Sequence, residues 1–138
     1  MILFHVAAII VTVLCVLYSD EQGLRWMLGK KEVLNAKKIA VLHVLVSIGL
    51  ALIILTGGLK AMTALAYYLS NPLFIAKMGF VLVLVVNGFF IGTLSTLATT
   101  RSFASLSTKE RLPLLASGAA SVLGWGGAIL LGLLLAFY

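Results

Sequence analysis

Three ionisable side chains interrupt the long apolar segments of this chain: His5, His43 and Lys77. An imidazole in such a position is able to bind a haem iron or a metal, and a lysine is able to pair with an anionic group. The acidic residues instead all fall in short polar connections: Asp20, Glu21, Glu32 and Glu110. We therefore expect no carboxylate at membrane depth. Proton-coupled transport and acid–base catalysis then lack their usual parts, and a small multidrug exporter, which needs a carboxylate in its first helix, is disfavoured on the same ground.

The spacing of the polar residues predicts two polar levels in the membrane. At a rise of about 1.5 Å per residue, His5 and Lys77 lie near one boundary, and His43 and Asn87 lie near the other. The two histidines are then roughly 15–20 Å apart, which argues against one haem held by both within a subunit. A haem bound by one histidine, or shared by two copies of the chain, stays open. The same spread of depths argues against a zinc site that includes Cys15.

His43 is the strongest candidate for a ligand-binding role. Ser47 and Ala51 follow it at helical spacing and predict a small, polar face that looks into the bundle. The alternative is a structural hydrogen bond from His43 to Asn87. His5 carries a similar choice between a ligand role and a simple hydrogen bond to water or to a neighbouring side chain.

Two further residues have both a structural and a functional interpretation. Lys77 either extends to the headgroups or acts as a buried cation. Trp125 lies between Gly124 and Gly126 and is either a packing wedge or the wall of a flat cofactor or lipid pocket. The predicted cofactor-binding set is thus His43, His5, Lys77, Asn87 and Trp125, with no catalytic and no metal-ligating residue.

Composition identifies the elements that must position these residues. Hydrophobic residues make up 62% of the 138 residues and charged residues 10%, whereas soluble domains are roughly 45–50% apolar. Four segments reach the length of about 20 residues that a membrane helix needs, at 2–19, 39–58, 72–94 and 114–138. Period-2 alternation, which a barrel requires, is missing from them. We expect one all-α domain, a bundle of four transmembrane helices with short interfacial helices in its loops.

Basic residues predict the orientation of this bundle. They gather in the first and third connections: Arg25, Lys30, Lys31, Lys37 and Lys38 in one, and Arg101, Lys109 and Arg111 in the other. We expect the chain to cross the inner (plasma) membrane of a cell. The positive-inside rule then places both connections on the cytoplasmic side and both termini outside. The net charge of +6 is then a topology signal, and nucleic-acid binding is not expected.

Small residues predict how the helices pack. The last segment carries one at every fourth position: Ala116, Ala120, Gly124, Ala128, Gly132 and Ala136. Such a row lets a second backbone approach closely, and Gly88, Gly92 and Thr96 in the third segment are the expected mate. We expect this packing within one chain, with self-association of two chains as the alternative.

Local signals describe the connections. The range 21–34 predicts an interfacial helix with Trp26 at headgroup depth. The range 60–70 predicts a similar segment on the other side, and Asn71-Pro72 predicts the start of the third helix. Ser107 and Glu110 have the spacing of a capping box, and Pro113 predicts a bend shortly after it.

The order of polar residues resembles that of a known group of proteins. His5 opens the first segment, His43 lies early in the second, and Lys77 opens the third, with Asn87 after it. The chain is similar in this to small bacterial four-helix membrane proteins related to the copper-resistance protein CopD and to HemJ-type protoporphyrinogen oxidases. The resemblance implies a b-type haem bound by His5, with Lys77 contacting tetrapyrrole carboxylates. Asn87 stands where a histidine is expected and an acidic-proline motif is missing before the last segment, which weighs against oxidase activity.

These observations favour a non-enzymatic integral membrane protein that packs as an accessory component of a larger membrane assembly. Its expected partners are the lipid bilayer and other membrane subunits, or a second copy bound through the small-residue faces. The alternative is a haem-, tetrapyrrole- or copper-related membrane protein that binds or oxidises a cofactor.

Overall fold

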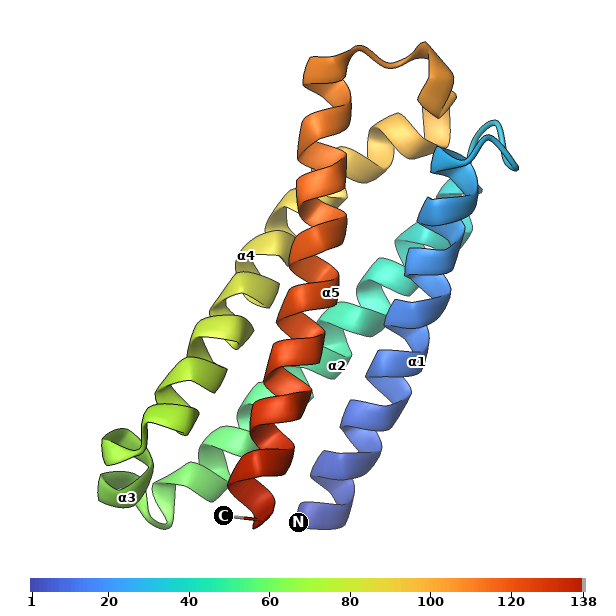
Figure 1. The fold of residues 1–138 in the computed structure, drawn as a ribbon. Helices are drawn as coiled ribbons and strands as arrows, with labels where there is room; N and C mark the ends of the chain where they lie inside the picture. The colour runs from blue at the N-terminus through green and yellow to red at the C-terminus, as the bar shows by residue number, and fades with distance from the viewer. Residues whose placement is uncertain (138) are drawn as a thin grey trace.

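Four long helices run up and down the molecule in the computed structural model, which describes residues 1–137 (Figure 1). They are α1 (Ile2–Met27), α2 (Ala36–Met62), α4 (Pro72–Thr100) and α5 (Thr108–Phe137). Each is long and apolar enough to cross a membrane. A short helix, α3 (Leu65–Ser70), joins α2 to α4, and a 3-10 turn, η1 (Phe103–Ser105), precedes α5. The prediction of an all-α four-helix membrane bundle is confirmed.

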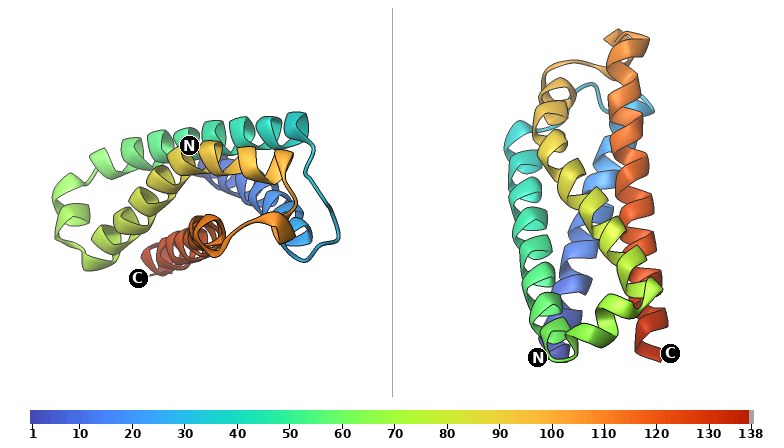
Figure 2. Two further views of the ribbon diagram at one scale, coloured as in Figure 1. Left: turned by 90° about the horizontal axis from the view of Figure 1, so that it is seen from above. Right: turned by 90° about the vertical axis from the view of Figure 1, so that its left-hand side faces the viewer.

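The two ends of the bundle differ in what they contain. The loops 28–35 and 101–107 lie at one end, called the loop end, and the two chain ends lie at the other, called the termini end (Figure 1). The bundle consists of two antiparallel pairs, α1 with α2 and α4 with α5, and α4 crosses obliquely between α5 and α2 (Figure 2). Contact between the pairs is much less extensive than contact within them.

Close helix crossings hold each pair together. The Thr12 side chain of α1 fills the space beside Gly49 of α2, where an added Cβ atom would collide with it. In the second pair, a Cβ atom at Gly124 would lie 2.6 Å from Leu84 Cδ2, and one at Gly127 would lie 2.7 Å from the Phe80 ring. Apolar side chains gain little by leaving lipid for protein, so membrane helices associate through this kind of close packing.

The small-residue row of α5 therefore packs within the chain, as expected, but against an earlier part of α4. Leu84 occupies the row at Gly124, and the Phe80 ring lies beside the row at Gly127. The expected mate is wrong, because a Cβ atom at Gly88 or at Gly92 would meet nothing within 4 Å. The oblique course of α4 is the reason: its first half follows α5, and its second half leaves α5 toward the start of α2 (Figure 2).

The largest cluster of buried side chains joins the two pairs at the loop end. This Trp26 cluster consists of Trp26, Leu34, Ala98, Leu106 and Leu114. Trp26 is only 1% exposed, donates a hydrogen bond from Nε1 to the Arg101 carbonyl at 2.9 Å, and contacts the Phe103 ring edge to face at 5.3 Å. The Leu34 amide also donates to the Ala98 carbonyl at 2.8 Å. The prediction of a separate interfacial helix that carries Trp26 is wrong, because Trp26 belongs to α1 and is buried in the core.

The helix ends confirm some local signals and correct others. Asn71 caps α4 by accepting the Leu73 amide at 2.9 Å, and Ser107 and Glu110 form the expected capping box. The loop 28–35 holds no helix, however, because α1 continues to Met27. Pro113 lies inside a continuous α5, and the predicted helix end at residue 138 lies outside the described residues.

Candidate functional site

His5 lies on α1 at the termini end and contacts α2. Its Nδ1 atom is 2.6 Å from the Thr56 hydroxyl, which donates its single hydrogen to the Leu52 carbonyl at 2.7 Å. His5 therefore donates through Nδ1, and Nε2 keeps the lone pair that binds a proton or a metal. Gly57 allows this approach, because the position of a Cβ atom there is 3.3 Å from His5 Cε1.

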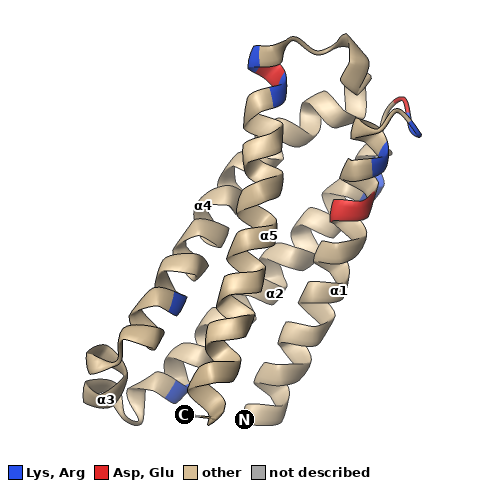
Figure 3. Cartoon of the chain, viewed as in Figure 1, with Lys and Arg blue, Asp and Glu red and all other residues tan. Residues whose placement is uncertain are grey.

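Two lysines share the termini end with His5. Lys60 lies beside His5 and Thr56 in a small groove of about 130 Å³. Lys77 reaches from α4 to α5, where its Nζ atom is 3.3 Å from the position of a Cβ atom on Gly132. No hydrogen bond joins His5 to Lys77 in the range 1–137, although both lie toward the same end, as predicted. This end carries no acidic side chain, which makes it a region of net positive charge (Figure 3).

His43 occupies a different environment from the one that the sequence predicts. Ser47 and Ala51 are exposed on the outside of α2, so the small face that these two residues form does not look into the bundle. The expected hydrogen bond between His43 and Asn87 is wrong, because Asn87 Oδ1 accepts from the Ser117 hydroxyl of α5 at 2.7 Å. His43 itself is half-buried and makes no side-chain hydrogen bond among the described residues.

The two histidines are far apart, as the analysis of depths predicts. His5 contacts Thr56, which follows His43 by 13 positions on the same helix, and at about 1.5 Å per residue this is a separation of about 20 Å. One subunit therefore does not hold a haem between both imidazoles. Within residues 1–137, no group of three or more His, Cys, Asp or Glu side chains is arranged to hold a metal ion.

A carboxylate that the sequence analysis assigned to a loop faces the interior of the bundle. Asp20 belongs to α1, and its Oδ2 atom accepts a hydrogen bond from the Ser121 hydroxyl of α5 at 3.4 Å. Ser121 is buried and stands 13 positions after Thr108, close to the middle of α5. The prediction that Asp20 lies in a polar connection is wrong, because Asp20 belongs to α1, and the argument against a small multidrug exporter loses this premise.

Asp20 belongs to a polar bridge that crosses the bundle, formed by Asp20, Ser121, Ser117 and Asn87. The two serines are four positions apart and share one face of α5. Ser121 bonds to Asp20 of α1, and Ser117 bonds to Asn87 of α4. Each hydrogen bond pairs polar groups that would otherwise be unpaired among apolar side chains. The spacing of the two serines in the sequence predicts that they share a face of α5, but not which helices that face meets.

Trp125 lies in the middle of the bundle rather than at either end. It is 9% exposed and packs with Val16 of α1 and Leu84 of α4. Its ring thus fills the space where α1, α4 and α5 meet, which is the geometry of a packing wedge.

The arrangement brings together His5 with Thr56 and Lys60, and separately Asp20 with Ser121 and Asn87 with Ser117. It leaves His43 and Trp125 at separate places. Comparison of the chain with profiles of protein families, with curated proteins and with solved structures finds no match.

Proposed function

We propose that this chain is a non-catalytic accessory subunit that packs into a larger membrane assembly through the outward face of α4. The observation that supports this role is an unpaired row of small residues, Gly88, Gly92 and Thr96. An added Cβ atom at either glycine would meet nothing within 4 Å, and Thr96 is exposed. In membrane proteins such rows are the lines along which helices approach most closely.

One large side chain borders this row and extends the contact surface. Phe89 is 80% exposed. A second helix that lies in the shallow channel of Gly88 and Gly92 would cover this ring and gain many weak contacts at once. The partner that fits is a transmembrane helix with small residues of its own, from another subunit or from a second copy.

In the orientation that we propose, the loop end lies on the cytoplasmic side of an inner membrane. Eight of the ten basic residues lie in or beside the loops of that end, and positive charge next to membrane helices is retained on the cytoplasmic side. Both termini, α3 and the small groove at His5 then face outward.

Bulky substitutions on the outward face test the proposal. The variant Gly88→Leu/Gly92→Leu is expected to reduce the mass of the particle extracted in native lipid, as measured by light scattering, to that of the free chain. Gly79→Leu is the matched control, because Gly79 also has nothing within 4 Å and lies on the opposite side of α4. Thermal stability of the isolated chain is expected to stay unchanged in both variants. An unchanged particle mass in Gly88→Leu/Gly92→Leu would contradict the role.

A second candidate function rests on His5. Its Nε2 lone pair is free while Thr56 orients the ring, and Lys60 and Lys77 supply positive charge at the same end. These residues fit one axial bond to a haem iron with the carboxylates of the tetrapyrrole on the lysines, as the likeness to CopD and HemJ-type proteins implies. An optical spectrum of the protein purified from haem-sufficient cells tests this alternative: a Soret band that is lost in His5→Leu supports it, and a colourless protein argues against it.

A further inference from the structure

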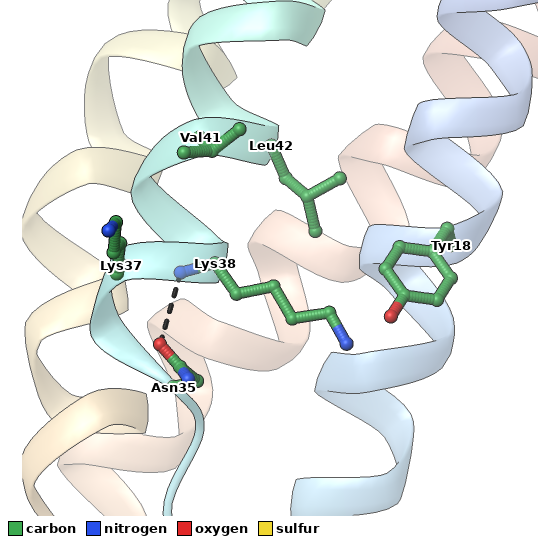
Figure 4. Close-up of a pocket in the computed structure, with 6 residues that line it drawn as sticks. All are labelled: Tyr18, Asn35, Lys37, Lys38, Val41 and Leu42. Carbon is green, nitrogen blue, oxygen red and sulfur yellow. Dashed lines mark hydrogen bonds between the residues drawn. The ribbon is translucent and has the colours of Figure 1, made fainter.

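A shallow groove of about 310 Å³ lies at the loop end, where α1 approaches the start of α2 (Figure 4). It combines basic, aromatic and apolar side chains within one small area. The lining residues are Tyr18, Asn35, Lys37, Lys38, Val41 and Leu42.

The positive charge in this groove is not neutralised by the protein. Lys38 extends across the groove to Tyr18, with Nζ 4.7 Å from the centre of the ring, and Lys37 is exposed. The ion pairs found in residues 1–137 join other basic groups, Arg25 to Glu21 and Arg101 to Glu110. The first turn of α2 also contains no acidic residue, although a helix N-terminus favours negative charge. No acidic side chain lines the groove, so no group within it neutralises its two lysines.

The groove continues into an apolar surface on α2. A small soluble anion would make no use of this surface. Val41 lines the groove and is 52% exposed, and Leu45 and Ile48 continue the same face of α2 with exposures of 48% and 54%. This face runs from the loop end toward the middle of the bundle. An occupant that uses both surfaces has a negatively charged head and a long apolar tail.

We propose that this groove binds an anionic phospholipid, with its phosphate on Lys37 and Lys38 and one acyl chain along Val41, Leu45 and Ile48. Basic pockets between membrane helices bind such headgroups, and each lysine near the surface contributes about fivefold in affinity. Tyr18 positions the Lys38 ammonium by a cation–π contact and keeps it at the mouth of the groove. The site does not depend on the proposed subunit role, because it lies on the other helix pair.

Native mass spectrometry tests the site with two lipids of identical acyl chains, phosphatidylglycerol and phosphatidylcholine. The variant Lys37→Gln/Lys38→Gln is expected to bind phosphatidylglycerol about thirtyfold more weakly, from two contributions of about fivefold. The control Lys30→Gln/Lys109→Gln removes the same charge from the same end but lies outside the groove. It is expected to weaken binding much less than the groove variant does, because these lysines contribute only diffuse attraction. Lys37→Gln alone, at an exposed position, is expected to weaken it about fivefold and serves if the double variant does not fold.

Three outcomes would overturn the proposal. Equal weakening in the groove variant and the control variant would show diffuse attraction to a basic surface and no site. Phosphatidylcholine that binds as tightly as phosphatidylglycerol would show that charge plays no part. Glycerol 3-phosphate that displaces the lipid at equal concentration would show a soluble-anion site that makes no use of the acyl chain.

Discussion

Removal of the Trp26 side chain is the perturbation with the largest expected effect on stability. The indole is 1% exposed and belongs to the cluster that joins α1, α4 and α5 at the loop end. Trp26→Ala deletes this packing and is expected to cost about 3–5 kcal/mol of the free energy of unfolding. Trp26→Phe keeps a ring against Phe103 but loses the hydrogen bond to the Arg101 carbonyl, which is worth about 1 kcal/mol. Trp26→Phe also leaves a small cavity, so the difference between the two variants measures the packing that the phenyl ring retains.

Titration of the folded protein with a denaturing detergent in mixed micelles measures these costs. The fluorescence of Trp125 reports unfolding in both variants, because the chain has only two tryptophans. Leu24→Ala is the control, since Leu24 lies two positions before Trp26 on the opposite side of α1 and is 55% exposed. If Trp26→Ala costs no more than Leu24→Ala, the cluster does not join the two helix pairs. If Trp26→Phe is as stable as the unmodified protein, the hydrogen bond contributes nothing.

Three further predictions address orientation, the polar bridge and the helix crossing. In a background without the native cysteine, a cysteine at position Lys60 is expected to react with an impermeant thiol reagent added to intact cells, and one at Arg101 is not; the reverse labelling would invert the orientation. Asn87→Leu and Ser117→Ala are expected to be non-additive, with a coupling of about 0.6 kcal/mol and at most nearly 2; simple addition of the two losses in unfolding free energy would remove this hydrogen bond from the bridge. Gly124→Ala is expected to lower the unfolding temperature and cost about 1–3 kcal/mol, because its Cβ atom collides with the buried Leu84 side chain; unchanged stability would mean that the crossing adapts freely.

Length and composition were sufficient to predict the four helices, because an apolar run of about 20 residues has few other solutions in a bilayer. Their ends were less predictable. The predicted end of the first helix, at residue 19, marks the end of apolar sequence, whereas α1 continues to Met27. The real signal is Gly29, whose φ of 77° is a left-handed conformation that favours glycine. The amides of Gly29 and Lys30 turn back to the carbonyls of Trp26 and Arg25 and close the helix.

The polar bridge was beyond reach of the sequence for a different reason. Asp20 and Ser121 are separated by 101 positions, and their contact depends on how α1 and α5 are rotated about their own axes. Spacing along one helix predicts which residues share a face, as it does for Ser117 and Ser121, but it does not say which neighbour that face meets. The same limit explains the incorrect mate of the α5 row: Gly88 has the right residue type, and the oblique course of α4 brings Leu84 to the row instead.

The uneven distribution of contacts between the two helix pairs has a mechanical consequence. At the loop end, the buried indole of Trp26 and the backbone hydrogen bond from Leu34 to Ala98 tie the pairs together. At the opposite end, the hydrogen bond of His5 stays within the first pair and the contact of Lys77 with Gly132 stays within the second, and no hydrogen bond found in residues 1–137 joins the side chains of the two pairs there. This distribution favours relative motion of the pairs that is smallest at the indole of Trp26 and largest at the termini end, where His5 and Lys77 belong to different pairs.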